Sequence, residues 1–358
     1  MKILFVNPFG IGDLLFTTPL ARALKKRGHT VYYWCNKRTQ GIIRHNDAVS
    51  GFFALSRGDL KKEFRSSPLG AAGKFLSLAR SLKKERFDTA LDFSLDSRYS
   101  LLLRLLGVRK LAGFDYKGRG RFLTHPVKMN GFHSRHMIDY YGMLLKYADE
   151  GALSSGETEL FTGDEEMSWA DGFLKEQGVG YKETVIGIAP GGGGSWGTDA
   201  YRKQWPKEKF AAVAGSLVVK YGLKIILFGS EEDEVICSFI GSRVKKNIIN
   251  TCGVLNIERF AELLKRCLVL ITNDGGPLHM ACALGVKTIS IFGPVSELVY
   301  GPSGRSGEDI VVTGDADCRP CYRHFRYPVC EDRICLKNIE PSRVLEAASG
   351  FLNKASSD

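Results

Sequence analysis

The sequence lacks a long apolar run. None of its 358 residues belongs to a stretch near the roughly 18 to 20 apolar residues that a membrane span needs, and the richest segment, residues 101–108, is interrupted by Arg104. Residues 1–6 carry one lysine and a short apolar stretch that soon meets Pro8, which is not the pattern of a signal peptide. We therefore expect a cytoplasmic protein without a membrane-spanning segment.

Disulfide bonds are a second feature that we do not expect. The chain has nine cysteines, and in a reducing cytosol most of them should remain thiols. Four lie close together in the sequence, at Cys318, Cys321, Cys330 and Cys335. Such a set could bind Zn²⁺ through thiolates, but its spacing matches no standard zinc finger. We predict a local structural cluster ahead of a zinc site, and no metal in the active site.

Acidic residues are scarce in the first part of the chain. Residues 1–150 hold 27 Lys and Arg against 12 Asp and Glu, and the whole chain carries a net charge of +11. Such a basic field attracts nucleic acid, an anionic membrane surface or an acidic small substrate. No recognition helix or aromatic and basic sheet motif accompanies the charge, so nucleic acid is the least favoured of these partners.

The length and the residue pattern indicate two α/β domains. A single hydrophobic core rarely grows beyond about 250 to 300 residues. Short apolar runs alternate with amphipathic helical stretches, which predicts parallel sheets covered by helices. The predicted strands are residues 2–6, 30–35, 89–93, 110–114, 185–189, 224–228, 247–250, 269–272 and 288–292. We expect domains at 1–165 and 180–340, and a helix at 341–358 that could pack back on the N-terminal domain.

The loop after the first predicted strand contains Gly10 and Gly12 but does not form a dinucleotide fingerprint, because position 15 is Leu. Asp13 stands where this loop passes into a helix predicted over residues 13–26. Two interpretations remain open. Asp13 could cap the helix N-terminus, or it could take a proton from a hydroxyl nucleophile in a cleft.

The second loop, residues 190–197, places four successive glycines after a buried strand. Glycines such as Gly192 and Gly193 let backbone N–H groups approach an anion closely, and Lys203 beyond the loop could add a full charge. No Walker sequence follows. The loop is either a phosphate cradle or a flexible surface segment.

The third loop, residues 272–279, joins a buried strand to a helix that begins near Pro277. N–H groups at Gly275 and Gly276 and the helix dipole would favour a diphosphate. His279 falls in the first helical turn and could donate a hydrogen bond to the same anion.

These residues resemble the glycosyltransferase family 9 heptosyltransferases of lipopolysaccharide core assembly. The matching segments occur in the family's order along nearly the whole chain. They are Gly12-Asp13-Leu14 with Thr18-Pro19, Pro190-Gly191 with Lys203-x-Trp205-Pro206, Cys252-Gly253, residues 273–281, and Phe292-Gly293-Pro294.

The resemblance implies a GT-B fold, in which two Rossmann-like domains with parallel sheets face each other across a cleft. It implies inverting transfer from a nucleoside diphosphate heptose, with ADP-heptose as the expected donor and no further cofactor. Asp13 would be the general base. The donor diphosphate would be bound by Lys203, Asp274, Gly275, Gly276 and His279, together with Gly192 and Gly193 of the second loop. Relatives commonly have Ser or Thr where this chain has Gly275, so one hydroxyl contact to the phosphate would be missing.

The resemblance also implies sites for the nucleoside and the acceptor. Asp233 matches the ribose-binding position, and Val254 and Leu255 lie where an adenine would pack. Arg98, Arg119 and Arg121 are candidates for holding an acidic, lipid-anchored glycan, with peripheral contact to the inner membrane. The alternatives are a GT-B nucleotide-sugar epimerase and a non-catalytic module that binds a nucleotide sugar.

Overall fold

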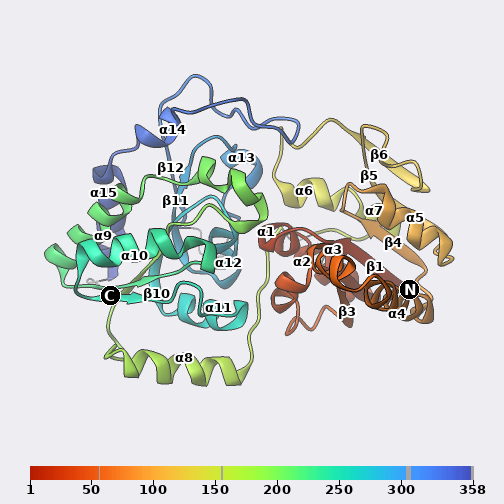
Figure 1. Ribbon diagram of the computed structural model, residues 1–358, viewed down its shortest axis with the longest axis horizontal. Coiled ribbons are helices and arrows are strands. Elements are labelled where there is room, and N and C mark those ends of the chain that lie inside the picture. Colours follow the sequence, from red (N-terminus) through yellow and green to blue (C-terminus); the bar gives the residue numbers. More distant parts are fainter. Residues whose placement is uncertain (56, 155, 304–307, 356–358) are drawn as a thin grey trace. The chain divides into compact units, whose positions relative to one another are not determined.

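The computed structural model describes residues 1–55, 57–154, 156–303 and 308–355. The chain divides into an N-terminal unit, Met1–Phe161, and a C-terminal unit, Thr162–Asp358. Each unit is built on one sheet of six parallel strands with helices packed on it (Figure 1). This arrangement confirms the predicted α/β fold. No helix in the described ranges combines the length and the apolar character that crossing a membrane requires.

The N-terminal sheet has the strand order β3-β2-β1-β4-β5-β6. Its strands are β1 (Lys2–Asn7), β2 (Thr30–Cys35), β3 (Gly51–Ala54), β4 (Thr89–Asp92), β5 (Lys110–Tyr116) and β6 (His125–Met129). Its helices are α1 (Ile11–Phe16), α2 (Thr18–Lys26), the 3₁₀ helix η1 (Lys37–Ile42), α3 (Arg57–Ser66), α4 (Pro68–Glu85), α5 (Ser97–Leu105), α6 (Met137–Gly142) and α7 (Leu145–Ala148). Residues 3–6 of the central β1 are fully buried, as expected for a strand covered on both faces.

The first helix of this unit is interrupted, whereas the sequence predicted one continuous helix over residues 13–26. The interruption lies at Thr17, between α1 and α2. Pro19 has no N–H to donate to the carbonyl of Leu15, and the hydroxyl of Thr18 donates to that carbonyl instead, at 2.8 Å. The break therefore follows from the Thr-Thr-Pro sequence.

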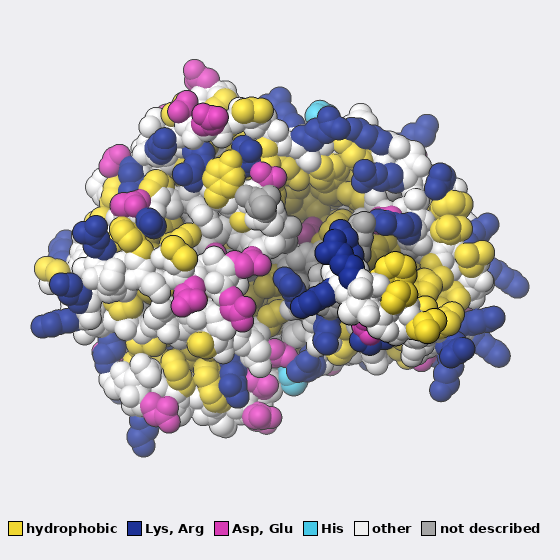
Figure 2. All heavy atoms as spheres, in the orientation of Figure 1, with side chains coloured by type: hydrophobic (Ala, Val, Ile, Leu, Met, Phe, Trp, Pro, Cys, Tyr) yellow, Lys and Arg dark blue, Asp and Glu magenta, His cyan; other side chains and the backbone are white. Residues whose placement is uncertain are grey.

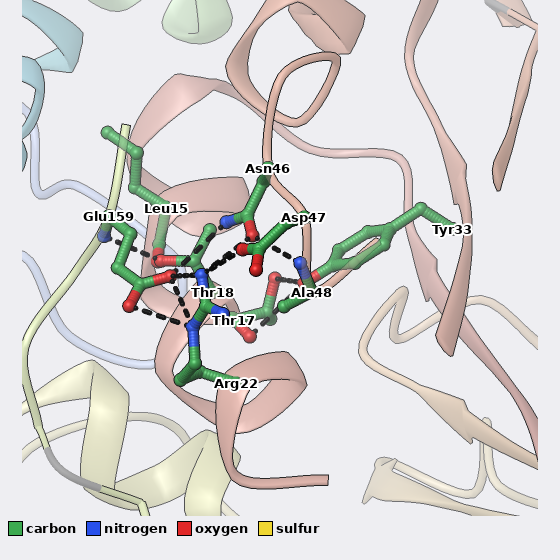
Figure 3. A network of polar contacts seen from close by, with 9 residues as sticks. All are labelled: Leu15, Thr17, Thr18, Arg22, Tyr33, Asn46, Asp47, Ala48 and Glu159. Atoms are coloured by element: carbon green, nitrogen blue, oxygen red, sulfur yellow. Dashed lines mark hydrogen bonds and ion pairs between the residues drawn. The ribbon is translucent and has the colours of Figure 1, made fainter. Parts of the chain in front are cut away.

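A polar network around Arg22 of α2 joins Glu159, near the end of the N-terminal unit, to the first helices of that unit (Figure 3). The guanidinium of Arg22 donates to both carboxylate oxygens of Glu159, at 3.0 to 3.1 Å, and also binds Asp47. The backbone N–H of Glu159 donates to the hydroxyl of Thr18 at 2.9 Å. These two acids raise the pKa of Arg22, so the cation is permanent. The segment around residue 159 is thereby held on α2, the helix that follows α1.

The C-terminal sheet has the order β12-β11-β10-β7-β8-β9. Its strands are β7 (Val185–Ala189), β8 (Lys224–Leu227), β9 (Ile248–Asn250), β10 (Cys267–Asn273), β11 (Lys287–Phe292) and β12 (Ile310–Thr313). Its helices are α8 (Asp164–Glu176), η2 (Gly194–Lys203), α9 (Lys207–Tyr221), η3 (Glu231–Asp233), α10 (Glu234–Val244), α11 (Ile257–Lys265), α12 (Gly276–Leu284), α13 (Glu297–Tyr300), α14 (Ile334–Lys337) and α15 (Pro341–Ala355). The central strands β7 and β10 carry the loops that the sequence analysis singled out.

The C-terminal helix packs within its own unit. Val344, Ala348, Phe351 and Leu352 of α15 belong to the same buried core as strands β7, β8, β10 and β11, and α15 packs beside α9. The sequence suggested that residues 341–358 could pack back on the N-terminal domain. In the described part of this segment the apolar stripe of α15 covers the C-terminal sheet.

Candidate functional site

Asp13 lies inside α1 and does not cap it. The N-cap of α1 is Gly10, and Asp13 sits in the first helical turn, so the capping interpretation was wrong. Its carboxylate Oδ1 accepts a hydrogen bond from the hydroxyl of Tyr141 at 2.8 Å. Its backbone carbonyl accepts one from the side-chain amide of Asn7 at 2.9 Å. Both the side chain and the backbone of Asp13 are therefore held in place just beyond the carboxyl end of β1.

Tyr141 is a functional candidate that the sequence did not reveal. It is 1% exposed, and its ring packs edge-on to Phe93 with the centroids 4.9 Å apart. It reaches Asp13 from α6, across 128 residues of sequence, and no local motif marks it. A rigid, buried phenol that donates to a carboxylate fixes the direction of that carboxylate, because the hydrogen bond is charge-assisted.

A small cavity of about 180 Å³ opens in the N-terminal unit, at the carboxyl ends of its strands. The lining residues are Pro8, Phe9, Asn36, Leu55, Gly58, Ser94, Asp96 and Tyr99. Ligands of parallel α/β sheets bind at this end of the strands. The cavity is bordered by the same β1–α1 loop that leads to Asp13, which makes it the candidate acceptor site of this unit.

The three predicted acceptor arginines lie in two places. Arg98 at the start of α5 donates to Asp96, a residue that lines the cavity, with Nε 2.9 Å from Oδ1. Arg119 and Arg121 lie between β5 and β6, where their guanidinium groups stack over Tyr116 and Phe122 at 5.8 and 4.8 Å from the ring centroids. All three side chains are exposed. Their role in holding an acceptor stays a prediction.

The glycine loop of the C-terminal unit is an ordered turn with close backbone packing. The amide of Asn273 donates to the carbonyls of Pro190 and Gly191, at 2.8 and 3.1 Å. A Cβ at Gly192 would lie 2.1 Å from the carbonyl oxygen of Ala200, and Gly193 has a φ of +84°, so both positions require glycine. Asn273 of β10 therefore holds the first two residues of the loop, Pro190 and Gly191, in place.

Lys203 and Asp274 form a buried ion pair beside this loop. Nζ of Lys203 lies 3.0 Å from Oδ2 of Asp274, and the two side chains are only 5% and 6% exposed. The same ammonium lies 4.3 Å from the ring centroid of Trp196 in η2. The structure thus brings together two predicted donor residues that are 71 positions apart in sequence. Trp196 is a further residue of this site, one that the sequence did not indicate.

An aromatic cluster covers the Trp196 side of the pair. The rings of Trp196, Tyr322 and Tyr327 lie 4.6 to 4.7 Å from one another. Burial, and next the charge of Asp274, raise the pKa of Tyr327. The segment after β12, in which the cysteines lie, therefore packs directly over the candidate donor site.

The four clustered cysteines are free thiols. Burial, and next the charges of Cys321, Cys318 and Cys330, raise the pKa of Cys335 to about 11, so these thiols lie within electrostatic reach of Cys335. Within residues 1–55, 57–154, 156–303 and 308–355, no three His, Cys, Asp or Glu side chains are arranged to hold a metal ion. The structure therefore gives no geometric support for a zinc site here.

The β10–α12 turn offers backbone donors next to the ion pair. Gly275 is extended and precedes α12, which begins at Gly276 with Pro277 in its first turn. A Cβ at Gly193 would lie 4.0 Å from the Cα of Gly275, so the two glycine loops approach each other. His279 is buried in the first turn of α12, with 6% exposure. The predicted donor residues at 192, 193, 203, 274, 275, 276 and 279 thus gather at one end of the C-terminal sheet.

The predicted nucleoside residues lie at the neighbouring strand ends. Oδ2 of Asp233 accepts from the N–H and the hydroxyl of Ser230, at 3.0 and 2.8 Å, and so caps η3. Val254 is 70% exposed and follows the turn at Gly253, and Leu255 is half-buried beside it. That these residues contact the nucleoside stays a prediction. Asp233 already has a structural role, because its carboxylate accepts hydrogen bonds from Ser230.

Two α/β units with parallel sheets, one with a buried Lys203–Asp274 pair at its strand ends and the other with the oriented carboxylate of Asp13, define a GT-B glycosyltransferase. Residues 75–326 match the family model described as glycosyltransferase family 9 (heptosyltransferase), and the chain belongs to that family.

Named relatives cover almost the whole chain. A lipooligosaccharide heptosyltransferase 2 of Campylobacter jejuni is 25% identical over 362 residues, covering 99% of both chains. Another, from Haemophilus ducreyi, is 30% identical and covers 83% of this chain and 84% of its own.

Solved structures share the fold at low identity. A family 9 glycosyltransferase from Veillonella parvula superimposes with a TM-score of 0.79 at 21% identity, over 99% of this chain and 97% of that one. The ADP-heptose lps heptosyltransferase II of Escherichia coli gives 0.75 at 20% identity, over 99% and 100%.

Proposed function

We propose that this glycosyltransferase inverts the anomeric centre as it transfers heptose, or a related sugar, from an ADP-heptose-type donor to the inner core of lipopolysaccharide. The observation that carries the proposal is the buried Lys203, held by Asp274 beside two glycine loops whose N–H groups can approach an anion. The names of the relatives support the choice of sugar and acceptor. The donor is a substrate, and we expect no added cofactor.

In this proposal the C-terminal unit binds the leaving group. Negative charge grows on the diphosphate as the bond to the anomeric carbon breaks. A fixed ammonium at Lys203, the N–H groups at Gly275 and Gly276 and the positive end of α12 would stabilise that charge where it develops. Asp274 keeps the ammonium in position, and His279 in the first turn of α12 adds a further donor. Asp233, Val254 and Leu255 are proposed to contact the nucleoside.

Asp13 in the N-terminal unit is the proposed general base. It takes the proton from the acceptor hydroxyl while that oxygen bonds to the anomeric carbon and the diphosphate departs. Base catalysis of this kind contributes roughly 10²- to 10⁴-fold. Tyr141 would act as a positioning residue, because its hydroxyl donates to Oδ1 of Asp13 and so fixes the orientation of the carboxylate.

The basic N-terminal unit fits an anionic acceptor. We propose that carboxylates or phosphates of a lipid-anchored glycan lie near the cavity at Ser94 and Asp96, with Arg98 closest and Arg119 and Arg121 farther along the same unit. The protein would work in the cytoplasm, at the face of the inner membrane.

The proposal is tested by separating chemistry from donor binding. Purified protein is incubated with ADP-heptose and a heptose-free core acceptor, and the products are analysed by mass spectrometry. Asp13→Asn should abolish transfer and leave ADP binding unchanged, whereas Lys203→Met should weaken ADP binding at least tenfold. Asp139→Asn, an exposed acid of the same unit, is the control and should behave as wild type.

Tyr141→Phe refines this test. A hydrogen bond to a charged group is worth about 1.5 to 3 kcal/mol, so its loss should slow transfer about 10- to 100-fold without changing ADP binding. Normal turnover by the Asp13 variant would refute the assignment of the base. An epimerised donor without transfer would favour the epimerase, and binding without any product would favour the non-catalytic module.

A further inference from the structure

The outer surface of α3, α4 and α5 exposes large apolar side chains to solvent. The exposed fractions are 63% for Phe64, 88% for Leu69, 40% for Phe75, 50% for Leu76, 37% for Leu101 and 75% for Leu105. We call this set the α3–α5 face. Scattered single exposed residues need no explanation, but six on three neighbouring helices do.

These side chains point away from the core of the N-terminal unit. Leu78 and Leu82 of α4 pack in one apolar cluster with Leu102 and Leu103 of α5, under which the strands lie. The inner sides of both helices are therefore already used. Leu69, Leu76 and Leu105 lie on the other sides, where half or more of each side chain stays open to solvent among the described residues.

The segment that carries most of this face is strongly basic. Between residues 57 and 86 the sequence has nine Lys and Arg and three Asp and Glu. Of the acids, Glu63 pairs with Lys74 and Glu85 with Lys2, which leaves a large positive excess. In Figure 2 hydrophobic side chains gather beside Lys and Arg side chains over the region where Figure 1 draws α3 and α4.

We propose that the α3–α5 face docks on an anionic lipid bilayer. Helices with apolar side chains flanked by lysine and arginine bind at the lipid headgroup boundary, where the apolar groups insert and the cations meet phosphates. The cores of protein interfaces are depleted in lysine, so a second protein fits this surface less well. The long lysine stems can cover apolar surface while their charges stay at the headgroups.

The position of the face agrees with the proposed acceptor, and the inference rests on that proposed function. Gly58 of α3 and Tyr99 of α5 line the cavity at the strand ends of the N-terminal unit. The helices that would contact the bilayer therefore also border the candidate acceptor site. A glycan whose lipid remains in the membrane would need to travel only a short way to reach it.

The test measures binding of the whole 358-residue chain to vesicles by co-sedimentation. Vesicles of phosphatidylcholine alone are compared with vesicles containing phosphatidylglycerol. Wild-type protein should bind the anionic vesicles at least tenfold more tightly, and added salt should release it. The Leu69→Ser/Leu76→Ser variant should lose at least tenfold in this affinity. Leu153→Ser is the matched control, since Leu153 is 85% exposed in the same unit but outside the face.

Three results would overturn the inference: equal binding to neutral vesicles, equal binding by the double variant, or an equal loss with Leu153→Ser. A dimer that the double variant abolishes, seen by light scattering without vesicle binding, would assign the face to a second copy instead. Circular dichroism of each variant controls for folding. If the vesicle results hold but no sugar is transferred, the proposed function fails and the docking surface stands.

Discussion

Removing one partner of the Lys203–Asp274 pair leaves the other charge buried. Both side chains are about 95% covered, and Nζ lies 3.0 Å from Oδ2. Asp274→Asn would strand the ammonium beside the ring of Trp196, and Lys203→Met would strand the carboxylate. The double variant Lys203→Met/Asp274→Asn leaves two neutral groups of similar size. The three variants therefore separate the cost of a lone charge from the value of the pair.

The expected magnitude follows from burial. Breaking a buried ion pair on one side costs about 3 to 5 kcal/mol, whereas replacing both partners is often close to neutral. Each kcal/mol lowers Tm by about 2 to 4 °C in a unit of this size, so each single variant should melt roughly 6 to 20 °C lower. The double variant should recover most of that loss. It should nevertheless bind ADP poorly, because the cation proposed to meet the diphosphate is gone.

The assay is thermal and urea unfolding followed by circular dichroism and tryptophan fluorescence. Arg202 and Asp199 provide the control pair, since they lie 2.9 Å apart but Asp199 is 53% exposed. Asp199→Asn should change the free energy of unfolding by no more than about 1 kcal/mol. Single effects at Lys203 and Asp274 that simply add in the double variant would refute the reasoning, because independent sites cannot be a pair.

Two further predictions concern burial and backbone geometry. Burial raises the pKa of Asp92 from 3.8 to about 6; ionising it therefore costs the folded state about 3 kcal/mol, and stability falls as the pH rises from about 4 to 6. Asp92→Asn should raise the free energy of unfolding at pH 7.5 and change it little at pH 3.5, and equal changes at both would contradict this cause. Gly192→Ala should weaken ADP binding at least tenfold, because its Cβ would meet the carbonyl of Ala200 at 2.1 Å. Gly215 of α9 has space for a Cβ, so Gly215→Ala should stabilise the protein by about 0.5 to 1 kcal/mol. Calorimetry would measure ADP binding by the Gly192 variant and thermal unfolding of the Gly215 variant.

The central strands could be predicted because they are buried on both faces. Strands β2 and β7 have the bounds that the sequence predicted, since each is a continuous apolar run. Three of the four edge strands, β3, β6 and β12, were missed. An edge strand pairs on one side and is only partly buried, so its sequence carries little of the apolar signal.

The sequence indicated the individual site residues but not the residues that they contact. The sequence identified Asp13, Lys203 and Asp274 because each lies in or just beyond a glycine-containing loop that follows a buried strand. It gave no sign of Tyr141, which reaches Asp13 from 128 positions away. It also left open whether Asp13 caps its helix, a question decided by Gly10 in the N-cap position.

The sequence by itself determined the α/β class, the family and the residue types that chemistry requires, because apolar periodicity and glycine spacing act over a few residues. Tertiary structure alone decided that Lys203 faces Asp274, that a buried phenol orients Asp13, and that α15 covers the C-terminal sheet. Those contacts depend on which strand ends and helix faces the sheet topology brings together, and that choice is made by long-range burial that no short segment encodes.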